Sequence, residues 1–299
     1  MSNLAKRIAS AAVMVPLVLA AVMWSPAWLW TIGVSLVAGV AAREIGTLAL
    51  QAGIDVSPGF VAIGTVALSW VAAELLGRPE WHLSGDALLA LFAVLVVAAF
   101  VDQLVRRPER RSAAAWAIAI AVPLYVGGMA TFVIRLRTMD DSAFWVLCLL
   151  VLVWVNDSAA YFGGRALGKH PMAPALSPKK TWEGLLVGTF VTIAVACLGF
   201  VVVYYVIESN SYVFGGSGPA SPWMSGEMLA KWVGMVALLG AAVSIAGPLG
   251  DLSHSFIKRQ FGAKDSSNMI PGHGGVWDRI DSLLFAAPVV YLFARLLGV

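Results

Sequence analysis

The stretch GLLVGTFVTIAVACLGFVVVYYVI, residues 184–207, decides the structural class of this protein. It contains no charged residue and exceeds the roughly 20 apolar residues that a helix needs to cross a hydrocarbon core about 30 Å thick. A strand of a transmembrane barrel would alternate apolar and polar residues instead. The stretch therefore predicts a transmembrane α-helix.

The composition of the whole chain agrees with a membrane protein. Of the 299 residues, 60% are hydrophobic and 12% are charged, whereas soluble globular domains have roughly 45–50% and about 25%. The mean hydropathy is +0.83. The chain has 20 Lys and Arg residues against 17 Asp and Glu, and its two cysteines lie within apolar runs. It is therefore neither a basic nucleic-acid binder nor a disulfide scaffold.

Nine apolar runs reach or approach the length of a membrane span. They are residues 8–24, 27–50, 58–77, 86–105, 112–134, 142–163, 184–207, 228–250 and 282–298. We therefore predict an all-α, polytopic integral membrane protein with about nine transmembrane helices. Within the fifth run, Pro123 and the pair Gly127-Gly128 predict a kink or a break.

The basic residues predict the orientation in the membrane, because cytoplasmic loops carry an excess of Lys and Arg. With a cytoplasmic N-terminus, nine spans place fourteen of the 20 basic residues inside. They are Lys6, Arg7, Arg106, Arg107, Arg110, Arg111, Arg165, Lys169, Lys179, Lys180, Lys258, Arg259, Lys264 and Arg279. We expect the inner (plasma) membrane, a cytoplasmic N-terminus, an extracytoplasmic C-terminus and an active site that faces the cytoplasm.

Candidate chemistry is concentrated in the second half of the chain. We expect residues 1–140 to form about five transmembrane helices without a recognisable motif, and residues 141–299 to form the catalytic transmembrane domain. In the first half, Arg43 and Glu44 interrupt an apolar run, and either a structural ion pair or a place in a polar cavity would explain them.

The first polar segment of the second half, residues 156–184, has the pattern of a phosphate site. Asp157 lies near the inner end of an apolar helix, where a carboxylate is costly and usually functional. Tyr161 and Arg165 follow on nearly the same helical face, and three glycines let the backbone approach a ligand. Lys179 and Lys180 precede the next span, and a helix N-terminus flanked by lysines binds phosphate. Membrane anchoring would explain the basic residues, but neither the glycines nor Asp157.

The second polar segment, residues 250–282, has the pattern of a metal and phosphate site. If the preceding helix continues, one of its faces carries Asp251, His254, Ser255 and Lys258. Asp278 and Asp281 lie one turn apart at the start of the last span, and carboxylates with Lys and Arg nearby suit Mg²⁺ held against substrate phosphates. The Gly-rich loop 271–275 can present backbone N–H groups to an anion. The alternative is a solvated loop with helix-capping acids.

The stretch from Ser253 to Asp281, SHSFIKRQFGAKDSSNMIPGHGGVWDRID, resembles the signature of the phosphatidate cytidylyltransferases, or CDP-diacylglycerol synthases. That pattern is S-x-[apolar]-K-R-x4-K-D-x-[small]-x2-[apolar]-[PG]-x-H-G-G-[apolar]-x-D-R-[apolar]-D. Every specified position is matched when the pattern starts at Ser255. Upstream, the stretches D-x-x-A-Y-x-x-G-R-x-x-G from Asp157 and S-P-K-K-T-x-E-G from Ser177 resemble the cytidine-nucleotide region of the same family.

The resemblance implies transfer of CMP from CTP to phosphatidic acid, which yields CDP-diacylglycerol and pyrophosphate for phospholipid biosynthesis. It also implies dependence on Mg²⁺, a homodimer, and a polar cavity open to the cytoplasm and to the lipids of the inner leaflet; whether a monovalent cation such as K⁺ joins the Mg²⁺ stays open. The residue chemistry agrees, because the substrate's own phosphate is the nucleophile and the enzyme needs chiefly metal and Lys or Arg.

The resemblance and the residue chemistry together give each residue an expected role. The expected metal ligands are Asp251, Asp278 and Asp281, which are also expected to be catalytic together with Lys258, Asp265 and His273. The phosphates are expected to contact Arg165, Lys179, Lys180 and Lys258. The other residues expected to bind substrate are Asp157, Tyr161, Ser255, Arg259, Lys264, Gly274, Gly275 and Arg279.

Two other functions remain as alternatives. A CTP-dependent polyprenol or lipid kinase would use the same donor, but the full signature disfavours it. A membrane transporter would carry ionisable residues in the middle of broken helices, whereas the charged motifs here cluster at one membrane face. A CDP-alcohol phosphotransferase would need a D-G-x2-A-R motif, which the sequence lacks.

Overall fold

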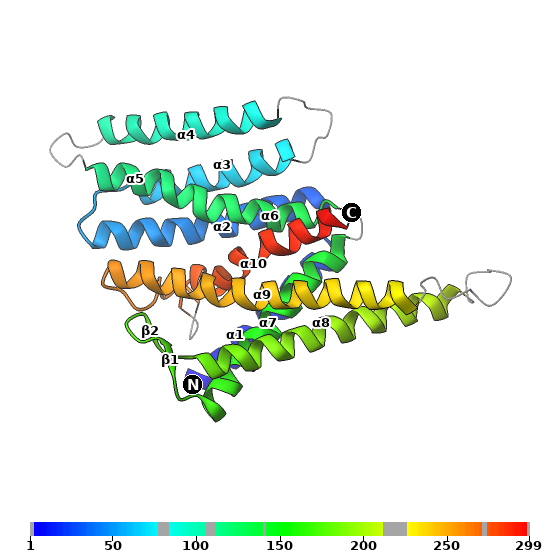
Figure 1. Cartoon of the computed structure of the whole chain (residues 1–299). Helices are drawn as coiled ribbons and strands as arrows, with labels where there is room; N and C mark the ends of the chain where they lie inside the picture. Colours follow the sequence, from blue (N-terminus) through cyan, green and yellow to red (C-terminus); the bar gives the residue numbers. More distant parts are fainter. Residues whose placement is uncertain are drawn as a thin grey trace. The chain divides into compact units, whose positions relative to one another are not determined.

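The computed structural model describes residues 3–76, 84–105, 112–139, 142–211, 226–270 and 274–297 (Figure 1). These residues are mostly helical, which confirms the all-α class, and the two strands named among them form one short hairpin. The elements are α1 (Asn3–Trp24), α2 (Ala27–Gln51), α3 (Pro58–Leu76), α4 (Ser84–Val105), α5 (Ala113–Val122), the π-helical turn η2 (Pro123–Gly127), α6 (Gly128–Leu136), α7 (Ser142–Leu167), β1 (Pro171–Ala173), β2 (Ser177–Thr181), α8 (Trp182–Ser211), α9 (Gly226–Gln260) and α10 (Trp277–Leu296).

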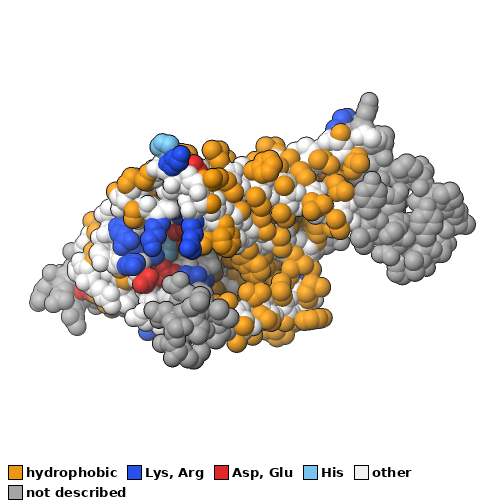
Figure 2. Space-filling model, turned by 90° about the horizontal axis from the view of Figure 1, so that it is seen from below, with side chains coloured by type: hydrophobic (Ala, Val, Ile, Leu, Met, Phe, Trp, Pro, Cys, Tyr) orange, Lys and Arg blue, Asp and Glu red, His pale blue; other side chains and the backbone are white. Residues whose placement is uncertain are grey.

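The structure is that of a polytopic membrane protein. Within the described residues, seven helical segments are long and apolar enough to cross a membrane, and the apolar helix Ser10–Trp24 is shorter. Large apolar side chains point outward along these helices: Phe190 of α8 is 74% exposed and Val94 of α4 is 63% exposed. Figure 2 shows hydrophobic side chains over much of the visible surface, with Lys, Arg, Asp and Glu gathered in one region. Such an apolar surface suits lipid and not water.

The chain divides into two compact units that are discontinuous in sequence. One unit combines residues 1–148 with residues 250–299, and the other contains residues 149–249. The C-terminal helix α10 therefore belongs with the N-terminal helices, against which it packs at α6 and α2. The predicted catalytic domain, residues 141–299, is defined by where the motifs lie in the sequence, whereas the compact units follow the packing of the helices.

In the first unit, small residues let the helices approach closely. The α2 and α3 helices lie side by side (Figure 1), and a Cβ atom at Gly46 would lie 3.0 Å from the Cα of Pro58. The α2 face that packs inward is rich in alanine, including Ala38, Ala41 and Ala42. Close backbone approach is what holds helices together in lipid, where apolar burial gives little driving force between them.

The fifth apolar run is irregular where the sequence predicts it to be, but it is not broken. Ser112 caps α5 by accepting a hydrogen bond from the N–H of Ala114, and the helix then passes through η2 into α6. Pro123 has no N–H to donate, and one π-helical turn absorbs the lost bond. A Cβ atom at Gly127 would lie 2.9 Å from the carbonyl oxygen of Thr65, so this glycine lets α3 come close.

In the second unit, glycines allow α7 and α8 to pack closely against each other. A Cβ atom at Gly184 would lie 2.7 Å from the carbonyl oxygen of Ala160, and one at Gly188 would lie 2.8 Å from Oδ1 of Asn156. On α7, a Cβ atom at Gly163 would lie 2.6 Å from the Cβ of Val187, so there is no room for a side chain at this position. We expected the glycines of residues 163–168 to admit a ligand, and at Gly163 the space is filled by the neighbouring helix instead.

Candidate active site

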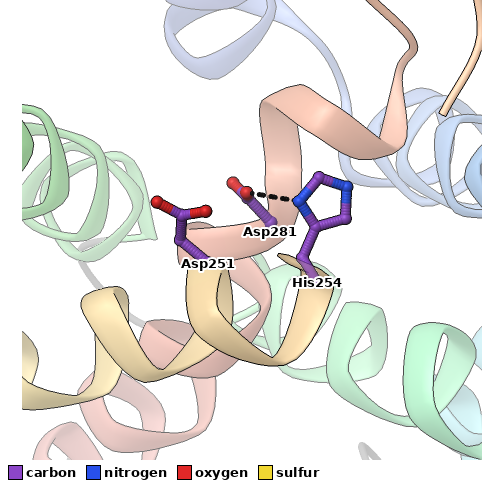
Figure 3. Close-up of side chains that lie close together, drawn as sticks. All are labelled: Asp251, His254 and Asp281. Carbon is purple, nitrogen blue, oxygen red and sulfur yellow. Dashed lines mark ion pairs between the residues drawn. The ribbon is translucent and has the colours of Figure 1, made fainter. Parts of the chain in front are cut away.

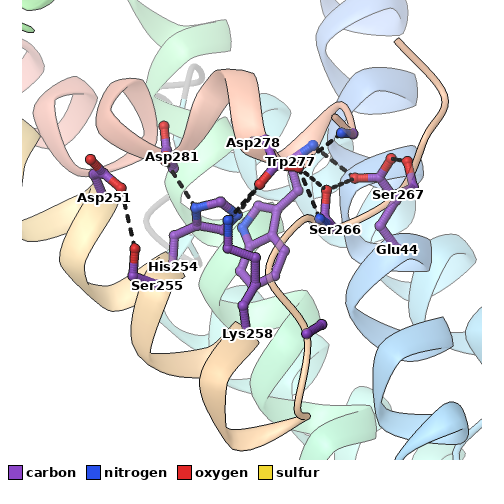
Figure 4. Close-up of polar contacts among 12 residues, drawn as sticks. Glu44, Asp251, His254, Ser255, Lys258, Ser266, Ser267, Trp277, Asp278 and Asp281 are labelled. Atoms are coloured by element: carbon purple, nitrogen blue, oxygen red, sulfur yellow. Dashed lines mark hydrogen bonds and ion pairs between the residues drawn. The ribbon is translucent and has the colours of Figure 1, made fainter. Parts of the chain in front are cut away.

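The end of α9 carries one polar face, as the sequence predicts. The helix continues to Gln260, so Asp251, His254, Ser255 and Lys258 share this face. The first turn of α10 brings Asp278 and Asp281 to it (Figure 4). All of these residues belong to the first compact unit.

Asp251, His254 and Asp281 form a cluster that could hold a metal ion (Figure 3). One possible ligand atom from each lies within 4.8 Å of the others. Nδ1 of His254 is 3.0 Å from Oδ2 of Asp281. Ser255 Oγ donates to Oδ1 of Asp251 at 3.5 Å, and the N–H of Ser282 donates to Oδ1 of Asp281 at 2.8 Å.

The donor set of this cluster fits a hard divalent cation. Two carboxylates from different helices approach each other, and such a pair is electrostatically unfavourable unless a cation lies between them. Mg²⁺ is bound through one or two carboxylates and completes its shell with water and substrate phosphates. His254 suits a supporting role better, because Mg²⁺ prefers oxygen ligands and the imidazole orients Asp281.

Asp278 uses both of its oxygens within the protein. Oδ1 lies 2.7 Å from Nζ of Lys258 and 3.1 Å from Nε2 of His254. Oδ2 accepts hydrogen bonds from the backbone N–H of Ser266 at 2.9 Å and from the N–H of Gly275 at 2.8 Å. It also lies 2.8 Å from Ser266 Oγ, whose single hydroxyl hydrogen is shared between Asp278 and Glu44. Burial raises the pKa of Asp278, but these donors outweigh burial and hold the pKa well below its usual range. In the structure Asp278 joins the loop to α9, and its role as a metal ligand stays a prediction.

His254 bridges the two aspartates of α10. It is 2% exposed, and its ring packs edge-on against Trp277 with the centroids 4.2 Å apart. Its two nitrogens face Asp278 and Asp281, so the ring fixes both carboxylates at once. The position of His254 three residues after Asp251 places it on the polar face, but spacing alone could not reveal that its ring lies between Asp278 and Asp281.

The glycine loop supports Asp278 from the other side. Ile270 and Gly274 form an isolated antiparallel bridge, in which the N–H of Ile270 donates to the carbonyl oxygen of Gly274. Gly274 has a φ of +79°, and a Cβ atom there would lie 2.6 Å from Oδ2 of Asp278. We expected the loop amides to face an anion, and the N–H of Gly275 does so, but the anion is the Asp278 carboxylate. His273 lies outside the described residues.

Four other predicted residues of this segment have exposed side chains: Arg259, Lys264, Asp265 and Arg279. Arg259 donates to the carbonyl oxygen of Ala263 at 3.2 Å, which closes the end of α9. Asp265 is not part of the Asp251, His254 and Asp281 cluster. The exposed side chains can meet a ligand that comes from solvent.

A buried carboxylate from α2 completes the network. Glu44 is 5% exposed, and its Oε1 accepts from Ser267 Oγ at 2.6 Å and from the N–H of Val276 at 3.0 Å. Its Oε2 accepts from Ser266 Oγ at 2.8 Å and from the N–H of Trp277 at 2.9 Å. The neighbouring Arg43 is exposed. Sequence spacing could not reveal Glu44 as part of the site, because its partners lie more than 220 residues away along the chain.

The second unit carries the other predicted residues on α7 and on the hairpin. The side chains of Asp157, Tyr161, Arg165 and Lys179 are exposed. Lys180 is half-buried, and its Nζ donates to the carbonyl oxygen of Pro248 at 3.3 Å. Glu183 fixes the hairpin to α8, because it accepts from the N–H groups of Lys169 and His170 and pairs with Nδ1 of His170 at 2.5 Å.

Comparison with known proteins identifies the family. A model described as the cytidylyltransferase family matches residues 5–297. The phosphatidate cytidylyltransferase of Brucella suis biovar 1 (strain 1330) is 41% identical over 145 residues, which cover 48% of this chain and 44% of the relative. The phosphatidate cytidylyltransferase of Haemophilus influenzae (strain ATCC 51907 / DSM 11121 / KW20 / Rd) is 42% identical, over 48% of this chain and 42% of the relative. That of Staphylococcus aureus (strain COL) is 36% identical, over 46% of this chain and 44% of the relative. The matched part thus spans less than half the length of each relative, whereas the family model spans nearly all of this chain, and the chain therefore belongs to the cytidylyltransferase family.

Proposed function

We propose that this protein transfers CMP from CTP to phosphatidic acid and forms CDP-diacylglycerol and pyrophosphate. The observation that carries the proposal is the approach of Asp251 and Asp281 beside the Lys258–Asp278 pair, in a chain of the cytidylyltransferase family. The name of the relatives, phosphatidate cytidylyltransferase, supports the choice of acceptor.

The reaction requires no nucleophile from the protein. A phosphate oxygen of phosphatidic acid attacks the α-phosphorus of CTP, and the bond from that phosphorus to the oxygen that bridges to the β-phosphate breaks. Pyrophosphate carries away the bonding electrons. Both reactants are anions, so the protein must bring them together, align them and stabilise the charge on the leaving group.

The two aspartates of the cluster would hold Mg²⁺. When bound, this ion would neutralise charge on the triphosphate and on the departing pyrophosphate. Asp251 is supported by Ser255, and Asp281 by His254, so each carboxylate is oriented before substrate arrives.

Lys258 would neutralise phosphate beside this cluster. One of its N–H groups is directed to Asp278, which leaves the others of the ammonium for phosphate oxygens. The exposed residues Arg259, Lys264, Asp265 and Arg279 would line the approach, and His273 would shape the loop.

The second unit would contact the nucleotide. Arg165, Lys179 and Lys180 would bind the phosphates of CTP, and Asp157 and Tyr161 would bind the remainder of the nucleotide. Four of these side chains are exposed on α7 and the hairpin, and Lys180 is half-buried. The two lysines also lie just before the N-terminus of α8, which favours phosphate.

We further propose nine membrane spans with a cytoplasmic N-terminus and an extracytoplasmic C-terminus. The support is the placement of basic residues that this count gives. The active site would then face the cytoplasm at the inner membrane, where CTP and membrane lipid meet, and the enzyme would act as a homodimer.

The position of the isotope tests the reaction. The purified protein is incubated with vesicles that contain phosphatidic acid, diacylglycerol and a polyprenol, with Mg²⁺ and with CTP labelled with ³²P at the α-position or at the γ-position. Cytidylyl transfer predicts label in lipid only from α-labelled CTP, together with release of pyrophosphate. Label in lipid only from γ-labelled CTP would establish a lipid kinase instead. No label in lipid from either nucleotide would reject both and favour a transporter.

A further inference from the structure

Glu44 accepts hydrogen bonds from four groups in the segment that joins α9 to α10, residues 261–276 (the catalytic loop), and at the start of α10. Two serine hydroxyls and two backbone N–H groups donate to it, and all four belong to residues 266–277 (Figure 4). The carboxylate is 5% exposed, so water cannot replace these bonds readily. A buried carboxylate with several donors is an arrangement that fixes its donors in space.

Glu44 also caps the helix that carries the aspartates. The residue that precedes α10 is Val276, which has no side-chain oxygen with which to bind the free N–H groups of the first turn. Glu44 accepts the N–H groups of Val276 and Trp277 from a different helix. A negative charge at a helix N-terminus is favourable, since the helix dipole is positive there.

Ser266 links Glu44 to Asp278. Its Oγ lies 2.8 Å from Oε2 of Glu44 and 2.8 Å from Oδ2 of Asp278. Between the same groups lies Gly275, where an added Cβ would overlap Ser266 Oγ and both oxygens of Glu44. The path from Glu44 to Lys258 therefore consists of directly touching groups: Glu44, Ser266, Asp278 and Lys258.

We infer that Glu44 is a positioning residue for the catalytic loop, through which α2 of the N-terminal half sets the place of Asp278 and thereby of Lys258 and His254. The inference rests on the proposed function for its catalytic consequence, but not for its structural one. Glu44 touches neither substrate nor metal in this scheme and acts only through the residues that it holds.

The test compares Glu44→Gln with the parent by two independent measurements. Gln keeps the size of Glu44, but whichever way its amide turns, one backbone N–H of α10 faces the NH₂ group and loses its acceptor. Amide hydrogen exchange of the purified protein in lipid is expected to become at least 10-fold faster in peptides from residues 264–281 and to stay unchanged in α3 and α4. The kcat with CTP and phosphatidic acid is expected to fall about 10- to 100-fold, with a smaller change in the KM for CTP, since misplacement by about 1 Å costs this much.

Two further variants keep the test decisive. Ser267→Ala removes one donor to Glu44 without leaving an uncompensated charge, and it should accelerate exchange in the same peptides by a smaller factor if Glu44→Gln does not fold. Asp86→Asn changes an exposed carboxylate of α4 and should match the parent in both measurements.

The outcomes separate the two proposals. If the parent makes no CDP-diacylglycerol, the proposed function fails, and the exchange rates still decide the role of Glu44. Exchange that is unchanged in residues 264–281 of Glu44→Gln, or faster by the same factor throughout the chain, overturns the inference. In the first case the loop does not depend on Glu44, and in the second Glu44 merely stabilises the whole fold.

Discussion

Nζ of Lys258 lies 2.7 Å from Oδ1 of Asp278, and the two side chains are only 12% and 6% exposed. The amine comes from the end of α9 and the carboxylate from the first turn of α10, so the pair joins the two helices that supply the proposed metal site. A buried pair of this kind is costly to break from one side, because the remaining charge keeps its desolvation penalty.

Lys258→Met should therefore lower both turnover and stability. We expect kcat to fall about 100-fold, because a phosphate loses its counter-charge, and the melting temperature to fall as Asp278 loses one of its donors. Lys231→Met changes an exposed lysine of the same helix and should match the parent. Parental activity of purified Lys258→Met would remove Lys258 from the phosphate site.

Asp281→Asn tests the metal assignment. It keeps the size of the side chain, removes one of the two facing charges, and should reduce turnover on the order of 100-fold or more. The Mg²⁺ concentration that gives half-maximal activity should rise as well. The control is Asp55→Asn, in the turn between α2 and α3, which we expect to be nearly silent. Near-parental turnover with unchanged Mg²⁺ dependence would exclude Asp281 as a metal ligand.

Asp278→Asn should behave differently from Asp281→Asn, because it disturbs the loop. In the parent, the pKa of Asp278 is lowered in the folded protein, so the charge of Asp278 stabilises the fold at pH values above the ordinary pKa of an aspartate, about 4. This contribution disappears as the pH falls through the lower folded pKa. Thermal unfolding in detergent should show Asp278→Asn to be less stable than the parent at pH 7, with a gap that narrows below about pH 4. A gap that does not change with pH would contradict the assigned role.

Lys180→Ala should weaken the use of CTP chiefly through a higher KM. Lys180 lies at the entry to α8, where its charge adds to that of the helix N-terminus, and its Nζ is held near Pro248. Titration of CTP at saturating phosphatidic acid measures the effect, with Lys231→Ala as the matched control. Superimposable titration curves for Lys180→Ala and the parent would show that Lys180 does not bind CTP and serves only as a membrane anchor.

A reporter fused after residue 299 tests the predicted topology. Nine spans and a cytoplasmic N-terminus place it outside the cytoplasm, where alkaline phosphatase is active and green fluorescent protein is dark. Fusions after residues 110 and 265 should give the opposite pattern. A cytoplasmic signal at the C-terminus would show that the count of spans is wrong.

The parts of the site that the sequence could predict are those set by local periodicity. The spacing of Asp251, Ser255 and Lys258 predicts a shared face of a continuing helix, and α9 has that face. The irregularity at Pro123 is also a local property, because the missing N–H is visible in the residue itself.

The parts that could not be predicted depend on contacts between distant segments. The spacing of Asp278 from Asp281 predicts a metal ligand, but it could not reveal that Ser266, Gly275 and Lys258 are the partners of Asp278 in the structure. The sequence leaves open whether Glu44 forms an ion pair or lies in a polar cavity, because only the folded chain brings residues 266–277 to α2. A glycine such as Gly163 can indicate either a flexible backbone near a ligand or close helix packing, and the sequence does not distinguish them. The structure shows close packing of Gly163 against Val187.

The distance along the chain between Glu44 and Ser266 has a consequence for how the protein is made. The two residues are separated by 222 positions, so α2 enters the membrane long before its partners exist. At roughly 5–20 residues per second, the ribosome needs on the order of 10–45 s to supply them. During that interval Glu44 lacks the four donors that bond to it in the finished protein. The catalytic loop and its cap can form only after the last segments emerge, so an interrupted chain carries an unsatisfied acid that membrane quality control could detect.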